Sequence, residues 1–174
     1  WIDIYNSSFL ISNSKSPQIY HKSKLVVGVE NMPYKNILEP LLGNILLNFG
    51  GTVNSRGIQD KRDVFELDNG VKVAPIICYE SVYGEYITEY VRNGAQFLAI
   101  ITNDGWWDES QGYKQHLSYA KIRSIETRRS IARSANTGSS AVINNKGEII
   151  KKLDYNSKGI INGEIHISNH LTFY

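Results

Sequence analysis

The stretch Val73-Ala74-Pro75-Ile76-Ile77-Cys78-Tyr79-Glu80 joins a run of apolar residues directly to the only cysteine of the chain. A short apolar run bounded by polar residues is typical of a buried strand, so we expect a strand that ends at Cys78. Beyond it, apolar residues repeat at helical spacing from Val82 to Val91, and Asn93-Gly94 supplies a helix C-cap. This stretch therefore predicts a strand, a cysteine at a turn, and then a helix.

A second apolar strand, Phe97 to Ile101, follows the predicted helix. Strand, helix and strand in this order form a βαβ unit, in which the two strands run parallel and need a crossover connection. Such a unit places Cys78 at the carboxyl end of a parallel strand, where open α/β sheets hold their functional sites. The sequence thus predicts an α/β fold with Cys78 at its site.

The other elements predicted from the sequence are mostly strands joined by short turns. Asp68-Asn69-Gly70 and Asn144-Asn145-Lys146-Gly147 are hairpin signals. Two further helices are expected, a short one over 37–49 that ends at Gly50-Gly51 and a longer one from Gln115 to Arg133. The remaining expected strands lie at Asn6–Ile11, Ile19–Val27, Val64–Leu67, Ala141–Ile143 and Ile149–Ile150.

Length and composition fit one globular domain, because the chain has 174 residues, of which 41% are apolar and 21% charged. The formal net charge is only +2 and the basic residues are scattered, so no nucleic-acid partner is expected. No stretch of about 18 uninterrupted apolar residues occurs, so nothing in the chain as given is expected to span a bilayer. Because the chain starts at Trp1 rather than Met, we expect it to be a piece of a longer protein.

Cys78 has two interpretations. A lone thiol is commonly a small buried hydrophobe, but a strand end followed by a helix N-terminus favours a reactive thiolate. A thiol nucleophile also needs a base, and a cationic or N–H-rich site for the oxyanion that forms during acyl transfer. The histidines have neither thiol-protease nor metal-ligand spacing, so we expect ordinary surface or hydrogen-bonding roles for them and no metal site. They are His21, His116, His166 and His170.

A set of short motifs is distributed along nearly the whole chain, from Tyr5 to Tyr174. The motifs are Tyr20-His21-Lys22, Glu30, Ile77-Cys78-Tyr79-Glu80, Asn103-Asp104-Gly105-Trp106, Gln115-His116-Leu117, Arg123-Ser124-Ile125-Glu126, Arg133 and Asn136-Thr137-Gly138. Together they resemble the nitrilase superfamily, and within it the membrane acyltransferases of bacterial lipoprotein maturation, because Cys-Tyr-Glu replaces the Cys-Tyr-Asp common in amidase relatives. The resemblance implies a nitrilase-like α-β-β-α sandwich, incomplete in this chain.

The resemblance also implies a catalytic set. Cys78 would be the nucleophile, and Lys22 would stabilise the oxyanion together with the backbone N–H of Tyr79. Glu30 matches the glutamate that supports the lysine. Lys24 competes with Lys22, but we expect Lys24 to be solvated because the apolar run begins only at the next residue. No metal or organic cofactor is implied.

One part of the family pattern is absent from the chain. The family's general-base glutamate precedes the segment Tyr5-Asn6-Ser7, and no glutamate occurs here before Glu30, which already matches the supporting glutamate. The family's flanking membrane helices are absent as well. We therefore expect residues 1–174 to be the C-terminal part of a nitrilase-like catalytic domain, and we expect this part alone to be inactive.

The implied reaction is an acyl transfer in two steps. Cys78 would take an acyl chain from a phospholipid as a thioester and pass it to the N-terminal amine of a diacylglyceryl-cysteine lipoprotein. The catalytic domain would lie on the periplasmic face of the bacterial inner membrane. The residues implied to handle these substrates are Tyr79, Glu80 and Trp106. A soluble carbon–nitrogen hydrolase and a non-catalytic module are the alternatives, and the flanking sequence of the full gene would distinguish them.

Overall fold

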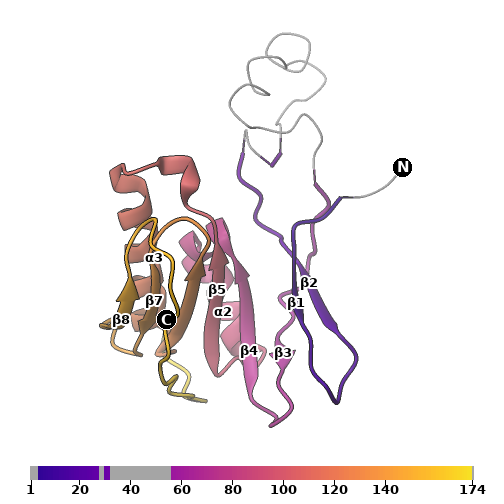
Figure 1. Cartoon of the computed structure of the whole chain (residues 1–174). Coiled ribbons are helices and arrows are strands. Elements are labelled where there is room, and N and C mark those ends of the chain that lie inside the picture. Colours follow the sequence, from indigo (N-terminus) through magenta and orange to yellow (C-terminus); the bar gives the residue numbers. More distant parts are fainter. Residues whose placement is uncertain (1–3, 28–29, 32–55, 174) are drawn as a thin grey trace.

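A six-stranded sheet forms the centre of the molecule in the computed structural model, which describes residues 4–27, 30–31 and 56–173 (Figure 1). β4, β5 and β6 run parallel, whereas β3, β7 and β8 pair antiparallel with their neighbours. The predicted α/β fold is confirmed. In sheet order the strands are β3 (Phe65–Glu66), β4 (Lys72–Ile77), β5 (Phe97–Thr102), β6 (Ile131–Ala135), β7 (Ser140–Ile143) and β8 (Ile149–Leu153).

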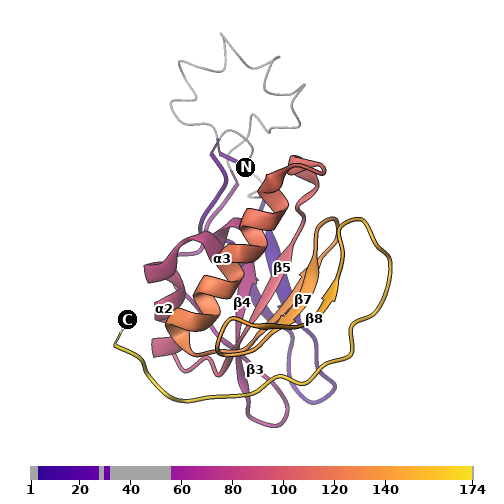
Figure 2. The same ribbon diagram turned by 90° about the vertical axis from the view of Figure 1, so that its left-hand side faces the viewer.

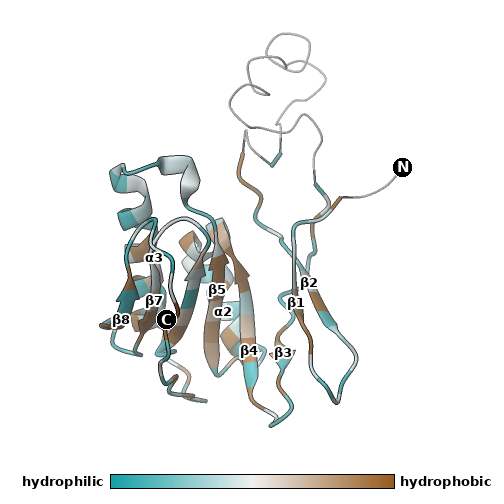
Figure 3. Cartoon of the chain, in the orientation of Figure 1, coloured by the Kyte–Doolittle hydropathy of each residue, from teal (hydrophilic) through white to brown (hydrophobic). Residues whose placement is uncertain are grey.

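Two helices lie side by side on one face of this sheet (Figure 2). α2 (Gly84–Arg92) is the crossover between β4 and β5, and α3 (Gln111–Thr127) is the crossover between β5 and β6. The strands behind them are apolar along most of their length (Figure 3), and Ile76 and Leu98 are fully buried. Burial of these side chains against the helices is the main stabilising contribution to this part of the fold.

A separate antiparallel pair, β1 (Ser7–Leu10) and β2 (Gln18–His21), lies beside β3 and β4 (Figure 1). The Gln18 side chain joins the two sheets, because its Nε2 donates to the carbonyl of Glu66 at 2.8 Å and its Oε1 accepts from the N–H of Glu66 at 2.8 Å. The residues after β2 consequently approach the turn after β4, where the N–H of Ser23 donates to Glu80 at 2.7 Å. Among the described residues, β1 and β2 are the only strands outside the six-stranded sheet.

The strand that leads to Cys78 is confirmed, as is the hairpin before it. Gly70 has a φ angle of +80°, a left-handed conformation that glycine adopts without strain, and it completes the predicted turn between β3 and β4. A short 3-10 helix, η1 (Cys78–Val82), precedes α2, so Cys78 lies at the junction between β4 and a helical segment. The helix predicted over 37–49 and its end at Gly50-Gly51 lie outside the described residues.

The helix predicted over Gln115–Arg133 is wrong at its C-terminal end. α3 ends at Thr127, where Arg128 takes a left-handed φ angle of +53°, and residues from Ile131 form β6. The arginines of this segment suggest an exposed helix surface in sequence, but Arg133 is 4% exposed and forms a buried ion pair. The Arg133 guanidinium makes its contacts with residues that are distant in the sequence. Local periodicity does not reveal such contacts, so it could not predict that α3 ends at Thr127.

None of the helices in the ranges that the structure describes is both long enough and apolar enough to cross a bilayer.

Candidate active site

Cys78 follows β4 directly and is the first residue of η1. Its φ angle is +50°, a left-handed conformation that is uncommon for a residue with a side chain of this kind. Such strain persists only where the surrounding structure fixes it, and it is frequent at functional sites. The thiol is partly exposed at the carboxyl end of β4, so it is accessible to a small molecule.

Lys22 and Glu30 form a buried ion pair, with 2.5 Å between Lys22 Nζ and Glu30 Oε2. Glu30 also accepts from the Asn6 side chain and from the N–H of Val26, each at 2.9 Å. Burial raises the pKa of the Glu30 carboxyl, but the hydrogen bonds from Lys22 and Val26 outweigh it, so this pKa lies below its ordinary value. The Glu30 carboxylate holds the Lys22 ammonium group in a fixed position. The lysine side chain is only 1% exposed.

A cavity of about 480 Å³ is lined by both Lys22 and Cys78, which are distant from each other in the sequence. Lys24 is not among the residues that line it, because its Nζ lies 5.6 Å and 5.5 Å from the ring centroids of Tyr83 and Tyr86. The structure therefore places Lys22, rather than Lys24, in the wall of the same cavity as Cys78. The other residues lining this cavity are Asn6, Val26, Glu30, Arg56, Ile77, Tyr79, Ile101, Thr102, Asn103, Trp106 and Trp107.

The cavity is lined by both polar and apolar side chains. Lys22 and Glu30 contribute polar side chains, whereas Trp106 and Ile101 contribute apolar side chains that are 57% and 50% exposed. Large apolar side chains that stay this exposed around a cavity are typical of a surface that contacts an apolar ligand or a partner. The arrangement suits a molecule with a reactive polar group next to a hydrocarbon portion.

Glu80 has a different environment from the one expected of a residue that handles substrate. It is fully buried, and it is not among the residues that line the cavity. Its Oε1 accepts from the Tyr20 hydroxyl and from the N–H of Ser23, each at 2.7 Å, and its Oε2 accepts from the N–H of Ile77 at 2.8 Å. Glu80 thus joins the segment after β2, which carries the lysine, to the turn that carries the nucleophile candidate.

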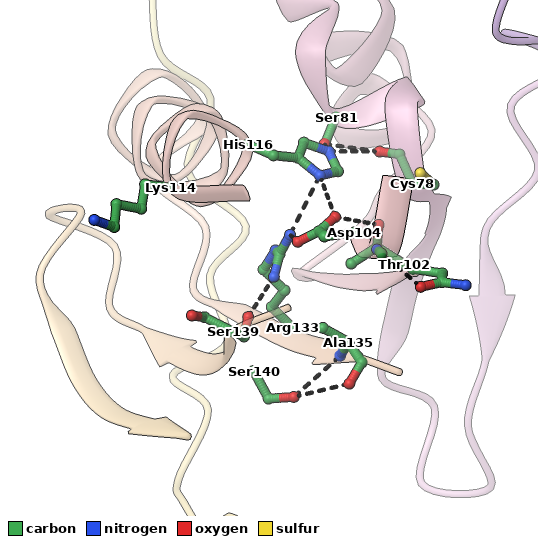
Figure 4. Close-up of polar contacts among 12 residues, drawn as sticks. Cys78, Ser81, Thr102, Asp104, Lys114, His116, Arg133, Ala135, Ser139 and Ser140 are labelled. Carbon is green, nitrogen blue, oxygen red and sulfur yellow. Dashed lines mark hydrogen bonds and ion pairs between the residues drawn. The ribbon is translucent and has the colours of Figure 1, made fainter. Parts of the chain in front are cut away.

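A second buried network, which the sequence did not predict, lies next to the carbonyl group of Cys78 (Figure 4). His116 Nδ1 lies 2.8 Å from Asp104 Oδ1, and Asp104 Oδ2 lies 2.6 Å from Arg133 Nη2. Thr102 donates to Asp104 Oδ1 at 3.0 Å. A side chain at Gly138 would place its Cβ 2.5 Å from Asp104 Oδ2, so the carboxylate requires glycine there. All three charged or ionisable members of the network, His116, Asp104 and Arg133, are buried.

The network raises the stability of the fold at neutral pH. Burial raises the pKa of the Asp104 carboxyl, but the hydrogen bond from His116 and the charge of Arg133 outweigh it, so this pKa lies below its ordinary value. The pKa of Glu30 is also lowered. A lowered folded-state pKa contributes stability that is present above the unfolded-state pKa, about 4, and is lost as pH falls through the folded-state pKa.

We therefore expect the free energy of unfolding to fall below about pH 5. Urea unfolding at pH 7, 5, 4 and 3 measures this dependence. Asp104→Asn should flatten the dependence, because the amide does not titrate, whereas Asp108→Asn in an exposed loop should leave it unchanged. An unfolding free energy that is constant between pH 7 and 3 would contradict this expectation, because it would show that the two carboxyls have the same pKa in the folded and unfolded states.

Comparison with known proteins assigns the family. The family model described as carbon-nitrogen hydrolase matches residues 2–169, nearly the whole chain. The chain therefore belongs to the carbon–nitrogen hydrolase family. A solved structure of the same fold is the carbon-nitrogen hydrolase from Helicobacter pylori G27, with a TM-score of 0.61 and 15% identity over 86% of this chain and 52% of that chain. The expected nitrilase-like fold is confirmed.

Within the family, the chain is similar to curated proteins named apolipoprotein N-acyltransferase. The one from Chlorobaculum tepidum is 34% identical over 174 residues, which are 98% of this chain and 32% of that protein. The one from Rhodopseudomonas palustris is 35% identical over 158 residues, 90% of this chain and 29% of that protein. The resemblance to the acyltransferase branch is confirmed, and the chain spans about a third of the length of these relatives.

Proposed function

We propose that residues 1–174 are the C-terminal part of the catalytic domain of a bacterial apolipoprotein N-acyltransferase. The observation that carries the proposal is the cavity in which Cys78, in a left-handed conformation, shares the walls with the Lys22–Glu30 pair. The identity of about a third to curated N-acyltransferases supports the acyl-transfer branch over the amidase branch. The parent protein is the full-length protein that contains this chain. It would work at the bacterial inner membrane, with this domain on the periplasmic face of the membrane.

In the first half-reaction the Cys78 thiolate attacks the carbonyl carbon of a phospholipid ester. A carbon–sulfur bond forms and the carbonyl oxygen becomes an oxyanion, which Lys22 Nζ and the N–H of Tyr79 stabilise. The carbon–oxygen bond to the glycerol then breaks, and the lysophospholipid leaves after its alkoxide has gained a proton. The product is a thioester on Cys78.

In the second half-reaction the α-amine of a diacylglyceryl-cysteine lipoprotein attacks the thioester. A carbon–nitrogen bond forms through a second oxyanion at the same position, the amine loses a proton, and the Cys78 thiolate leaves. The lipoprotein gains an amide-linked acyl chain and the enzyme returns to its starting state. Tyr79 and Trp106, which line the cavity beside Cys78, are the described residues best placed to contact the two lipids.

The proton acceptor for Cys78 is proposed to lie outside residues 1–174. Among the described residues that line the cavity, Glu30 is the only carboxylate, and its oxygens already accept from Lys22, Asn6 and Val26. Glu30 could accept the thiol proton of Cys78 only by breaking its ion pair with Lys22. The family resemblance implies that the general base is a glutamate upstream of Tyr5.

The test of this function uses the parent protein in detergent, with a phospholipid and a synthetic diacylglyceryl-cysteine peptide. We expect an increase in peptide mass equal to one acyl chain, with release of the matching lysophospholipid. Release of ammonia from small amides without any acylated peptide would favour the soluble carbon–nitrogen hydrolase instead. Absence of both products from a folded protein would favour the non-catalytic module.

The 174-residue chain by itself is expected not to turn over phospholipid. Positioned acid–base groups typically contribute about 10²–10⁴-fold, so loss of the base should reduce thioester formation by about this factor. The comparison measures the rate of acyl adduct formation on the chain and on the parent protein under the same conditions. Equal rates would show that the base lies within residues 1–174.

A further inference from the structure

The carbonyl group of Cys78 is held by two side chains, Ser81 and His116. Ser81 Oγ donates to the Cys78 carbonyl oxygen at 2.8 Å, and His116 Nε2 lies 3.2 Å from the same oxygen and 2.9 Å from Ser81 Oγ. The Cys78 carbonyl oxygen and the Asp104 carboxylate can only accept, so we assign a proton to each of the two ring nitrogens of His116. One backbone oxygen in the strained turn therefore accepts from two buried side chains.

The position of this carbonyl determines where the next N–H points. The Cys78 carbonyl and the N–H of Tyr79 belong to one planar trans peptide unit, so they point in opposite directions. With the oxygen directed at His116 and Ser81, the N–H of Tyr79 is directed to the opposite side. Tyr79 and Cys78 both line the cavity, and the second N–H of a helical segment such as η1 has no partner within the helix.

His116 itself is held in a fixed orientation by the groups behind it. Asp104 contacts Nδ1 and is in turn held by Arg133 and by Thr102, and the ring packs edge-on against Trp107 with 5.4 Å between centroids. Figure 4 shows His116 between Asp104 on one side and the Cys78 carbonyl on the other. The buried Asp104 carboxylate therefore fixes the orientation of the His116 ring. The ring in turn fixes the orientation of the peptide group between Cys78 and Tyr79.

The same geometry shows that His116 does not contact the thiol. In Figure 4 the carbonyl of Cys78 is directed toward His116, and the sulfur lies on the other side of the residue. Both ring nitrogens have close partners, Asp104 for Nδ1 and the Cys78 carbonyl with Ser81 for Nε2. His116 acts on the backbone rather than on the sulfur.

We propose that His116, supported by Asp104 and Arg133, is a positioning residue that directs the N–H of Tyr79 into the cavity as an oxyanion donor. The proposal rests on the proposed function in one respect, that Cys78 accepts acyl groups. It predicts that His116 affects reactions of Cys78 that form an oxyanion and leaves other reactions of the thiol unchanged. A residue that merely stabilised the fold would affect both kinds of reaction equally.

The experiment compares two reactions of Cys78 in the parent protein, each followed by the mass of the peptide that contains Cys78, with Cys78→Ser as the blank. Acylation by p-nitrophenyl butyrate passes through an oxyanion, whereas alkylation by iodoacetamide does not. We expect His116→Phe to slow acylation by about 10²-fold, the effect of losing one oxyanion donor. Alkylation, which depends on the thiolate, should change by less than about threefold. The ester needs neither phospholipid nor amine, so failure of lipid transfer leaves this test intact.

Three further variants keep the test independent of folding defects in His116→Phe. His116→Gln retains an N–H donor for the carbonyl and should recover most of the acylation rate. Ser81→Ala removes the second donor and should slow acylation selectively, as His116→Phe does. His166→Gln, at an exposed histidine, is the matched control and should match the unsubstituted protein. Equal loss of both reactions in the His116 and Ser81 variants, or no loss of acylation in either, would overturn the proposal.

Discussion

Replacement of Cys78 by serine in the parent protein should reduce acyl transfer to the lipopeptide by at least about 10⁴-fold, as expected when the nucleophile of a covalent mechanism is removed. Serine keeps the size of the side chain, but its hydroxyl is far harder to deprotonate than a thiol. Transfer rates of the two proteins, measured by peptide mass, test this expectation.

The serine variant should remain folded, because the turn is held by backbone and side-chain contacts rather than by the sulfur. Ser81, His116 and Glu80 contact the backbone around residue 78 and are unchanged in this variant. Ser118→Ala on the exposed surface of α3 is a suitable control and should transfer at the unsubstituted rate. Transfer by a folded Cys78→Ser protein at more than a tenth of the normal rate would remove Cys78 from the mechanism.

The second large effect is expected at Lys22. Lys22→Met removes the cation that we propose to stabilise the oxyanion, and it should lower the transfer rate by about 10²–10³-fold. It also leaves the buried Glu30 carboxylate without its partner, and loss of one member of a buried ion pair typically costs about 3–5 kcal/mol of stability. Both the transfer rate and the urea midpoint should be measured, because the two effects have different causes.

Two variants separate the effect on catalysis from the effect on stability. In the double variant Lys22→Met with Glu30→Gln no unpaired charge remains, so most of the stability should return while the transfer rate stays low. Lys24→Met is the matched control, since Lys24 lies over the rings of Tyr83 and Tyr86 and does not line the cavity. A greater loss of transfer in Lys24→Met than in Lys22→Met would show that Lys24, rather than Lys22, stabilises the oxyanion.

The turn at Cys78 could be predicted because local sequence determines it. An apolar run that stops at the cysteine, followed by helical periodicity, leaves only the junction of strand and helix for this residue. The place of Lys22 in the same cavity could not be derived from periodicity. It depends on the docking of β2 against β3 through Gln18 and on the contacts of Glu80, which are long-range, and it was expected only from the family motifs.

The surroundings of His116 and Glu80 could not be predicted for a related reason. The sequence led us to expect an ordinary surface or hydrogen-bonding role for His116 and substrate contact for Glu80. Spacing arguments ask whether a histidine can be a base or a metal ligand, whereas the closest partners of His116 include a backbone carbonyl, which no sequence pattern reveals. The motif Gln115-His116-Leu117 was the available signal. Glu80 lies beside the nucleophile in sequence, which suggests substrate contact, but its carboxylate is directed into the protein and binds the N–H groups of Ser23 and Ile77.

The end of α3 was predicted wrongly because the sequence does not show which charged residues are buried. The predicted helix continued through Arg128 and Arg129 to Arg133. In the structure Arg129 is 1% exposed and donates to the carbonyls of Ala95 and His170, and Arg133 pairs with Asp104. Only the three-dimensional positions of these acceptors explain why the chain leaves the helix at Arg128 and continues as β6.

The most direct test of the account is the mass of the parent protein after incubation with phospholipid and no acceptor. The account predicts an increase equal to one acyl chain, located on the peptide that contains Cys78, removed by hydroxylamine and absent from Cys78→Ser. Addition of the lipopeptide should remove the adduct and acylate the peptide in equal amount. Acylation of the lipopeptide by a protein that never carries an acyl group on Cys78 would contradict the account.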